Sequence, residues 1–97
     1  TETAEEELGE ILLYVAEQDG IDRALHVHGK FVEAFGTLAA MPDIGSNRPH
    51  LTGERVRWHT VFQWVVIYDP EASPITILRL IHGARDPDRI LRPDLGS

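Results

Sequence analysis

Hydrophobic positions in the first half of the chain recur at helical spacing and predict two amphipathic helices. In the first of these, apolar residues three and four positions apart fall on one stripe. This stripe consists of Leu8, Ile11, Leu12 and Val15. Thr3 and Glu6 have the spacing of a capping box, in which each side chain accepts a hydrogen bond from a backbone N–H at the helix start. We therefore expect a helix that starts near Thr3 and ends near Gln18, before an Asp-Gly pair.

A second helix is expected after a short turn. Asp22 is a suitable N-cap, and apolar positions again follow a helical repeat until a Met-Pro-Asp-Ile-Gly segment ends the helix at 41–45. The repeat consists of Leu25, Phe31 with Val32, Phe35 and Leu38. Because only about three residues separate the two helices, they are expected to form an antiparallel hairpin. Residues 46–54 are rich in turn formers and predict a loop.

The second half of the chain has the residue pattern of β-strands. Segment 55–61 alternates polar and apolar residues, which is typical of a half-exposed strand. Segment 62–68 is denser in β-branched and aromatic residues and is expected to be more buried. Segment 75–81 is a third, nearly all-apolar strand. Short turns between the three segments predict an antiparallel meander.

These elements predict an α+β fold in which the helical hairpin packs on one face of the antiparallel sheet. Within the third strand, Ile75, Ile77 and Leu80 are expected to lie on different faces. The length suits one domain spanning 1–97, with no repeats or linkers.

Charge is divided unevenly along this chain, whose formal net charge is −7. Residues 1–44 carry ten acids and two bases, whereas 45–97 carry six acids and seven arginines. Nucleic-acid binding normally relies on a basic field, so general nucleic-acid binding is not expected. The apolar runs are shorter than the roughly 20 residues that span a membrane. The absence of cysteine suits the reducing cytoplasm.

Four segments together resemble toxins of the RelE/ParE superfamily. They are LGEILLYVAEQ in the first helix, TLAAMPDIG at the end of the second, VVIYD in the middle strand and ILRLIHGARD in the last strand. The loop with Leu38, Pro42 and Gly45 and the phrase at 81–86 are most similar to the ParE branch. The resemblance covers nearly the whole chain. Family members usually begin with a short strand, whereas only two residues precede the predicted cap here, so the sheet is expected to have three or four strands.

The resemblance implies the toxin of a type II toxin–antitoxin pair. ParE-like toxins inhibit DNA gyrase, RelE-like toxins cleave messenger RNA on the ribosome, and both are neutralised by an antitoxin. A ParD-like antitoxin is therefore the expected partner, in a hetero-oligomer, through a helix in an apolar groove or a strand added at a sheet edge. Three functions remain open: a gyrase inhibitor that acts by binding, an mRNA endoribonuclease, and an inactive homologue that only binds antitoxin.

The residues favour the gyrase inhibitor over the nuclease. Cleavage through the RNA 2′-hydroxyl needs a base, an acid and cations near the phosphate, and the resemblance places one such cation at Arg85. Where the nuclease branch has a tyrosine, this chain has Leu91, which cannot transfer a proton. A different nuclease would have to combine His59 and His82 with Arg85, since histidine titrates near neutral pH.

Polar residues at the exit of the last strand form the predicted partner-binding site. Gly83 permits a sharp turn, and Asp86 followed by proline would open a short C-terminal helical turn. Arginines beside apolar residues are common at the centre of protein interfaces. The predicted target- or partner-binding residues are Arg57, Trp58, Arg79, His82, Arg85, Arg89 and Leu91. The alternative role of Arg85 is an ion pair with a nearby acid, and that of His82 is a hydrogen bond to the turn.

The two tryptophans are expected to differ in exposure. Trp64 lies in the apolar middle strand and should belong to the core, whereas Trp58 stands among cations and should be partly exposed, unless it packs under the helical hairpin. No cofactor or metal site is predicted. His26 and His28 are two residues apart on a helix, so their rings point about 200° apart and cannot easily share an ion.

Overall fold

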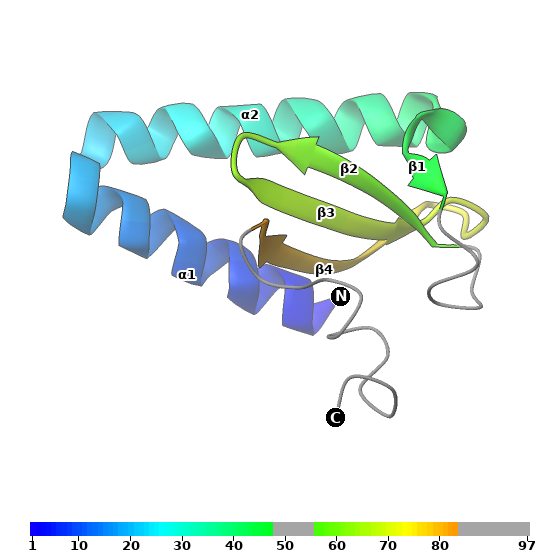
Figure 1. Ribbon diagram of the computed structural model, residues 1–97, viewed down its shortest axis with the longest axis horizontal. Coiled ribbons are helices and arrows are strands. Elements are labelled where there is room, and N and C mark those ends of the chain that lie inside the picture. The colour runs from blue at the N-terminus through cyan, green and yellow to red at the C-terminus, as the bar shows by residue number, and fades with distance from the viewer. Residues whose placement is uncertain (48–55, 84–97) are drawn as a thin grey trace.

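A helical hairpin and an antiparallel sheet make up the part of the chain that the computed structural model describes, residues 1–47 and 56–83 (Figure 1). The helices are α1 (Glu2–Asp19), α2 (Ile21–Ala40) and the short 3-10 helix η1 (Pro42–Ile44). The strands are β1 (Ser46–Asn47), β2 (Arg57–Val61), β3 (Trp64–Asp69) and β4 (Thr76–His82). They pair antiparallel in the order β1-β2-β3-β4. The predicted α+β fold is therefore confirmed, whereas the predicted C-terminal helical turn lies outside the described residues.

The two helices are joined by Gly20 alone. Its φ of 93° is open to glycine and costly for other residues, so the chain reverses within one residue instead of the expected three. The N-cap of α1 is Thr1, whose Oγ1 accepts a hydrogen bond from the N–H of Ala4 at 3.1 Å. The capping box expected at Thr3 is therefore wrong. The expected cap at Asp22 is also wrong, because α2 begins at Ile21, directly after Gly20.

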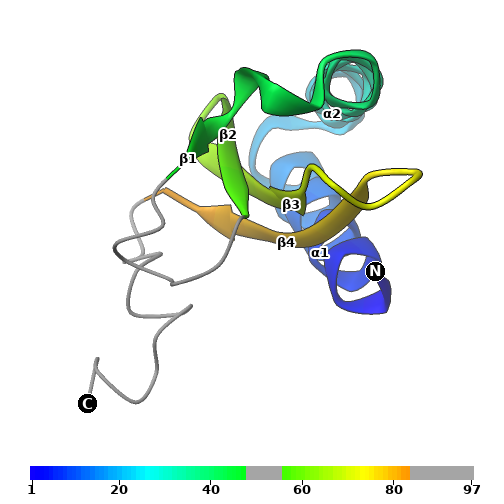
Figure 2. The same ribbon diagram turned by 90° about the vertical axis from the view of Figure 1, so that its right-hand side faces the viewer.

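The main core lies between the helices and one face of the sheet. Figure 2 shows both helices on the same side of the sheet. The buried residues of α2 are Ala24, Val27, Phe31, Ala34 and Leu38. Phe31 and the predicted core residue Trp64 pack with ring centroids 5.9 Å apart. Leu25 and Val32, which were expected in the apolar stripe, are instead 64% and 53% exposed.

A second apolar cluster covers the opposite face of the sheet. Trp58 is only 7% exposed there and packs with Ile67 and Ile81. The expectation that Trp58 is partly exposed is therefore wrong, and it does not pack under the helical hairpin either. Side chains alternate between the faces of a strand, so the polar neighbours Arg57 and His59 do not change the face on which Trp58 lies.

A β-bulge in β4 decides which of its side chains face the helices. Ile67 pairs with Arg79 and Tyr68 pairs with Ile77, so Leu78 is an extra residue in the ladder. Leu78 packs with the second cluster. The residues Ile75, Ile77 and Leu80 all belong to the helix-side core. The expectation that these three lie on different faces is therefore wrong.

The hydroxyl of Tyr68 connects β3 to the loop that follows α2. It donates a hydrogen bond to the carbonyl of Pro42 at 2.6 Å and accepts one from the N–H of Gly45 at 3.0 Å. A Cβ at Gly45 would lie 2.6 Å from this hydroxyl, so the close approach requires glycine. This contact gives a structural reason for the loop motif found in the sequence.

Residues of α1 bind the outer edge of β4. The Thr1 amino group donates to the carbonyl of Ile77 at 2.9 Å, and the Glu7 carboxylate accepts the N–H of Leu80 at 3.0 Å. Glu7 also accepts three hydrogen bonds from the Arg79 guanidinium at 2.8–3.1 Å. The hydrogen bond to Glu7 raises the pKa of Arg79 above its ordinary value, against a smaller opposing effect of burial. The Arg79 guanidinium therefore stays charged, and its contact with Glu7 fixes α1 against the sheet edge.

Replacement of Tyr68 by phenylalanine should lower the free energy of unfolding by about 1–3 kcal/mol, because the buried N–H of Gly45 and the partly buried carbonyl of Pro42 lose their partner. Urea denaturation measures this loss. Tyr14→Phe is the matched control, since Tyr14 is exposed on α1 and the change should have almost no effect. Equal losses in both variants would contradict the role assigned to the Tyr68 hydroxyl.

Replacement of Glu7 by alanine should cost about 2 kcal/mol of unfolding free energy, because both Arg79 and the N–H of Leu80 lose a charged acceptor. Glu6→Ala removes the same charge from an exposed neighbour on the same helix and should change stability by less than about 0.5 kcal/mol. Thermal and urea unfolding of the two variants distinguish a specific contact from general charge repulsion. A loss at Glu7 no larger than that at Glu6 would contradict the edge contact.

Candidate functional site

His82 is the last residue of β4 and lies at the end of the sheet, as the sequence predicted. Its side chain is exposed, and its ring meets the ring of Trp64 edge-on with centroids 6.3 Å apart. The next residue, Gly83, turns back so that its N–H donates to the carbonyl of Gln63 at 2.7 Å. A Cβ at Gly83 would lie 3.0 Å from that carbonyl oxygen. Glycine at this position thus closes the end of the β3–β4 pair and fixes the place where the chain leaves the sheet.

The other predicted partner-binding residues do not gather around His82 in the described part of the chain. Arg57 donates to the carbonyl of Gly45 at 2.8 Å and lies 3.7 Å from the Asp43 carboxylate. Arg79 is bound by Glu7. Both guanidiniums therefore hold elements of the chain together. These contacts within the chain explain the two arginines, and no binding protein is needed to account for them. The remaining predicted residues Arg85, Arg89 and Leu91 lie outside the described residues.

The two histidines of the ribonuclease alternative lie on different strands. His59 on β2 is opposite Val66, and His82 on β4 is opposite Trp64, so β3 runs between them. Two strand spacings put their backbones roughly 10 Å apart across the sheet. Each catalytic group must reach within hydrogen-bonding distance of the same substrate region. On the face that these pairs share, Val66 and Trp64 of β3 are buried in the helix-side core, so a substrate cannot lie across β3 to contact both rings. The third member of this set, Arg85, is outside the described residues.

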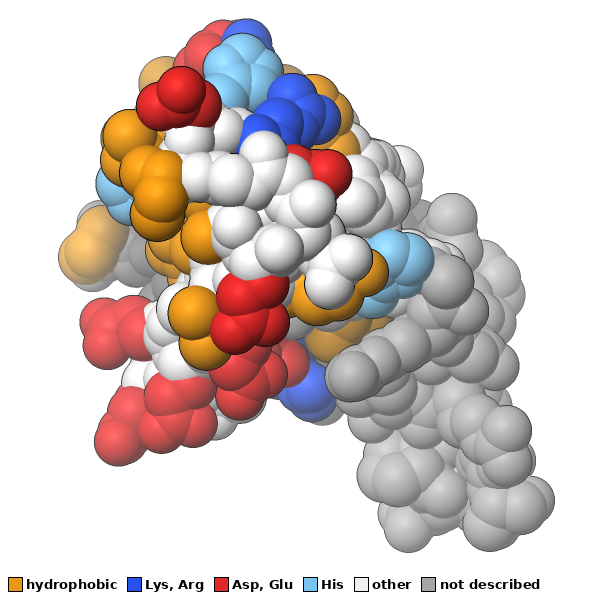
Figure 3. All heavy atoms as spheres, turned by 90° about the vertical axis from the view of Figure 1, so that its left-hand side faces the viewer, with side chains coloured by type: hydrophobic (Ala, Val, Ile, Leu, Met, Phe, Trp, Pro, Cys, Tyr) orange, Lys and Arg blue, Asp and Glu red, His pale blue; other side chains and the backbone are white. Residues whose placement is uncertain are grey.

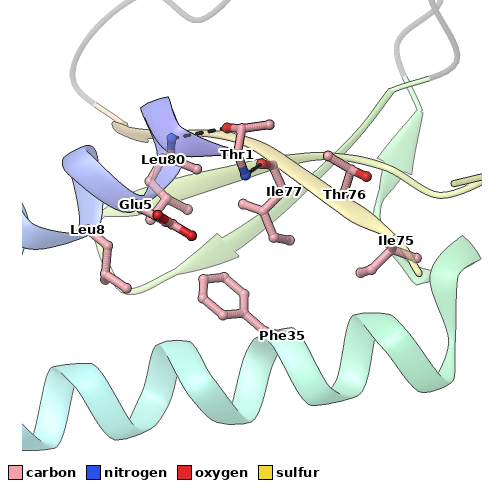
Figure 4. Close-up of a pocket in the computed structure, with 9 residues that line it drawn as sticks. Thr1, Glu5, Leu8, Phe35, Ile75, Thr76, Ile77 and Leu80 are labelled. Atoms are coloured by element: carbon pink, nitrogen blue, oxygen red, sulfur yellow. Dashed lines mark hydrogen bonds between the residues drawn. The ribbon is translucent and has the colours of Figure 1, made fainter. Parts of the chain in front are cut away.

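A pocket of about 330 Å³ opens where α1, α2 and β4 diverge. Figure 1 shows the two helices close together at their junction and farther apart toward the N-terminus, and Figure 4 shows this open end. Phe35 points from α2 toward Leu8 of α1 and Ile77 of β4. The full lining is Thr1, Ala4, Glu5, Leu8, Phe35, Ile75, Thr76, Ile77 and Leu80. The pocket is thus an apolar site that a side chain from a partner could fill.

The pocket lies next to an acidic stretch of α1. Glu5 is part of the lining, and Glu2 and Glu6 are exposed on the same first turns of the helix. Viewed from the junction of the helices, Figure 3 shows red side chains gathered at the lower left, over α1. A partner that fits this entrance would therefore carry an apolar residue flanked by basic ones.

Further apolar side chains are exposed along the helical hairpin. Leu13 on α1 and Ile21, Leu25 and Val32 on α2 are each more than half exposed. Exposed apolar residues that gather on one face of a small protein mark interaction surfaces. Of these four residues, Leu25 and Val32 were expected in the apolar stripe of the second helix. The shorter repeat of Ala24, Val27, Phe31, Ala34 and Leu38 would have identified the buried side correctly.

Among residues 1–47 and 56–83, no group of three or more histidine, aspartate or glutamate side chains has an arrangement that could hold a metal ion. No helix in the same ranges is long and apolar enough to cross a membrane.

Comparison with known proteins agrees with the order of these elements. A family model described as the ParE toxin of the type II toxin–antitoxin system, parDE, matches residues 1–87. No curated protein matches the chain. The match includes the helical hairpin, the whole described sheet and the exit of β4. The chain therefore belongs to the ParE toxin family of type II toxin–antitoxin systems.

Proposed function

We propose that this toxin inhibits DNA gyrase by binding it and that a cognate ParD-like antitoxin neutralises it in a hetero-oligomer. The observation that carries the proposal is the family match over residues 1–87. The proposal treats the chain as one toxin domain spanning 1–97 that acts in the cytoplasm. Its target-binding residues are His82 at the exit of β4 and, beyond the described part, Arg85, Arg89 and Leu91.

The disposition of the candidate catalytic residues supports a binding protein over a ribonuclease. His59 and His82 lie on strands separated by β3, and the resemblance to RelE-like nucleases fails at Leu91, which cannot act as an acid or base. Arg57 and Arg79, two of the cations on the sheet, are hydrogen-bonded within the chain. A phosphate between the histidines would gain little charge stabilisation from these engaged guanidiniums.

The antitoxin is proposed to occupy the pocket at the open end of the helical hairpin. The lining residues Phe35, Ile75 and Ile77 form an apolar surface for a side chain of the antitoxin. The glutamates of α1 favour basic residues next to that side chain in the bound segment. Helices that place apolar side chains in such grooves are a common recognition mode. A ParD-like segment with one apolar residue between lysines or arginines fits these requirements.

Purified toxin should block supercoiling of relaxed plasmid by gyrase, and antitoxin should restore it. Arg85→Ala should raise the half-inhibitory concentration about ten-fold or more, as loss of an interface hot spot does. Arg85→Lys should retain part of the inhibition, because the positive charge remains. Unchanged supercoiling at saturating, folded toxin would rule out gyrase as the target. New 5′ ends in messenger RNA after toxin induction would then favour the ribonuclease, whereas arrest-free expression would favour the inactive homologue.

Ile75→Glu should weaken antitoxin binding about ten-fold or more, because it places a charge in an apolar pocket already bordered by glutamates. Ile44→Glu adds the same charge at an exposed site on η1 and serves as the matched control. Isothermal titration calorimetry with purified antitoxin gives both dissociation constants. Equal affinities for the two variants would show that the antitoxin binds elsewhere.

A further inference from the structure

The turn between β2 and β3 carries an aromatic residue in an unfavourable backbone conformation. Phe62 has a φ of 53° and is 43% exposed. Two-residue hairpin turns often need a positive φ, and glycine, asparagine or aspartate usually supplies it. A bulky residue in this region costs stability, and such outliers concentrate at functional sites. The ring of Phe62 therefore needs an explanation beyond the turn itself.

Side chains of α2 hold this ring in a fixed position. The Cζ atom of Arg23 lies 5.0 Å from the ring centroid of Phe62, and the His26 ring centroid lies 6.1 Å away. An exposed cation–π contact is weakly stabilising, and it offsets part of the backbone cost. The result is a preorganised aromatic surface beside a cation, with much of the ring accessible to solvent. Preorganisation of this kind lowers the entropy lost on binding.

A shallow depression of about 360 Å³ continues from Phe62 between α2 and β2. Its walls include Lys30 and Glu33 of α2 and His59 and Thr60 of β2. Lys30 lies 3.5 Å from Glu33, but both side chains are well exposed, and exposed pairs of this kind contribute little. Lys30 therefore remains available to a carboxylate that competes with Glu33.

This region contrasts in charge with the rest of the helical hairpin. Arg23 and Lys30 are the only basic residues among positions 1–44, which carry ten acids. Figure 3 shows blue and pale-blue side chains together at the top, over α2, and most of the red ones below. A nucleic acid long enough to reach this small basic island would also approach the glutamates of α1. A short acidic segment would avoid the glutamates at the start of α1 and would meet Arg23 and Lys30 together with Glu33, the one acid that lines the depression.

We propose that Arg23, His26, Lys30 and Phe62 form a docking surface, here called the cation–aromatic surface, for an acidic segment of a protein partner. Carboxylates of the segment meet the side chains of Arg23 and Lys30, and an apolar residue between them covers the exposed part of the Phe62 ring. The surface lies beside the junction of the helices, whereas the pocket proposed for the antitoxin lies at their open end (Figure 1). The inference does not rest on the proposed gyrase or antitoxin function, because it requires only complementary charge and the preorganised ring.

NMR titration of the uniformly ¹⁵N-labelled full chain tests the proposal directly. The probe is the acetylated peptide amide Glu-Glu-Leu-Glu-Glu-Phe, with a glutamine-for-glutamate version as the uncharged control. The acidic peptide should shift the amide signals of residues 23–30 and 60–63, and the glutamine peptide should bind at least about five-fold more weakly. No shifts with the acidic peptide, or shifts confined to other elements, would overturn the proposal.

Phe62→Gly separates binding from folding. Glycine accepts the positive φ, so this variant should keep its Tm within about 4 °C of the parent while its peptide affinity falls about three- to ten-fold. Arg23→Gln should weaken the peptide about two- to five-fold, whereas Val32→Ala, an exposed control elsewhere on α2, should not. Equal peptide affinity for Phe62→Gly and the parent would overturn the proposal. A ten-nucleotide oligo(dT) that shifts the same amides at lower concentration would also overturn it, in favour of a nucleic-acid partner.

Discussion

The outer edge of β4 has backbone groups that need hydrogen-bond partners, and the rest of the architecture follows from how α1 supplies them. Unpaired groups at a sheet edge are costly when buried and promote association when exposed. Here the Glu7 carboxylate accepts the N–H of Leu80, and Thr1 donates to carbonyls of β4. This places α1 at the side of the sheet, while the apolar stripe of α2 lies over its face.

Gly20 alone joins the two helices, so they are close together at that point. They diverge from it because α1 lies along the edge of the sheet and α2 lies over its face. The divergence leaves the pocket lined by Phe35 and Ile77 at the open end, where a parallel pair of helices would have closed it. Near the junction, the start of α2 lies close to the turn at Phe62, where Arg23 contacts the ring. One contact at the sheet edge thus produces two surfaces of different chemistry, one apolar with an acidic border and the other aromatic with cations.

Much of this fold could be predicted from the sequence, whereas the candidate surfaces could not. Helical spacing and strand composition identified the hairpin and three strands because these signals are local. Thr1 and Thr3 are equally good caps in isolation, and only the contact of Thr1 with β4 selects the first. Trp58 was misplaced because its charged neighbours suggested exposure, yet strand alternation turns it toward Ile67. Arg79 looked available for a partner because its acceptor, Glu7, is 72 residues away in the sequence. The pocket depends on the angle between helices, which no local pattern encodes.

The bulge at Leu78 has a consequence for how the length of this strand can vary in evolution. With the extra residue, Ile75 and Ile77 share the helix-side face with Leu80, although the spacing between Ile77 and Leu80 is odd. Deletion of Leu78 itself would leave Ile77 and Leu80 two positions apart and restore a regular ladder, with Ile75 and Ile77 still facing α2. Deletion of Thr76 would instead shift Ile75 by one position and turn it away from α2. Single-residue deletions in β4 should therefore be tolerated at the bulge and selected against elsewhere in the strand.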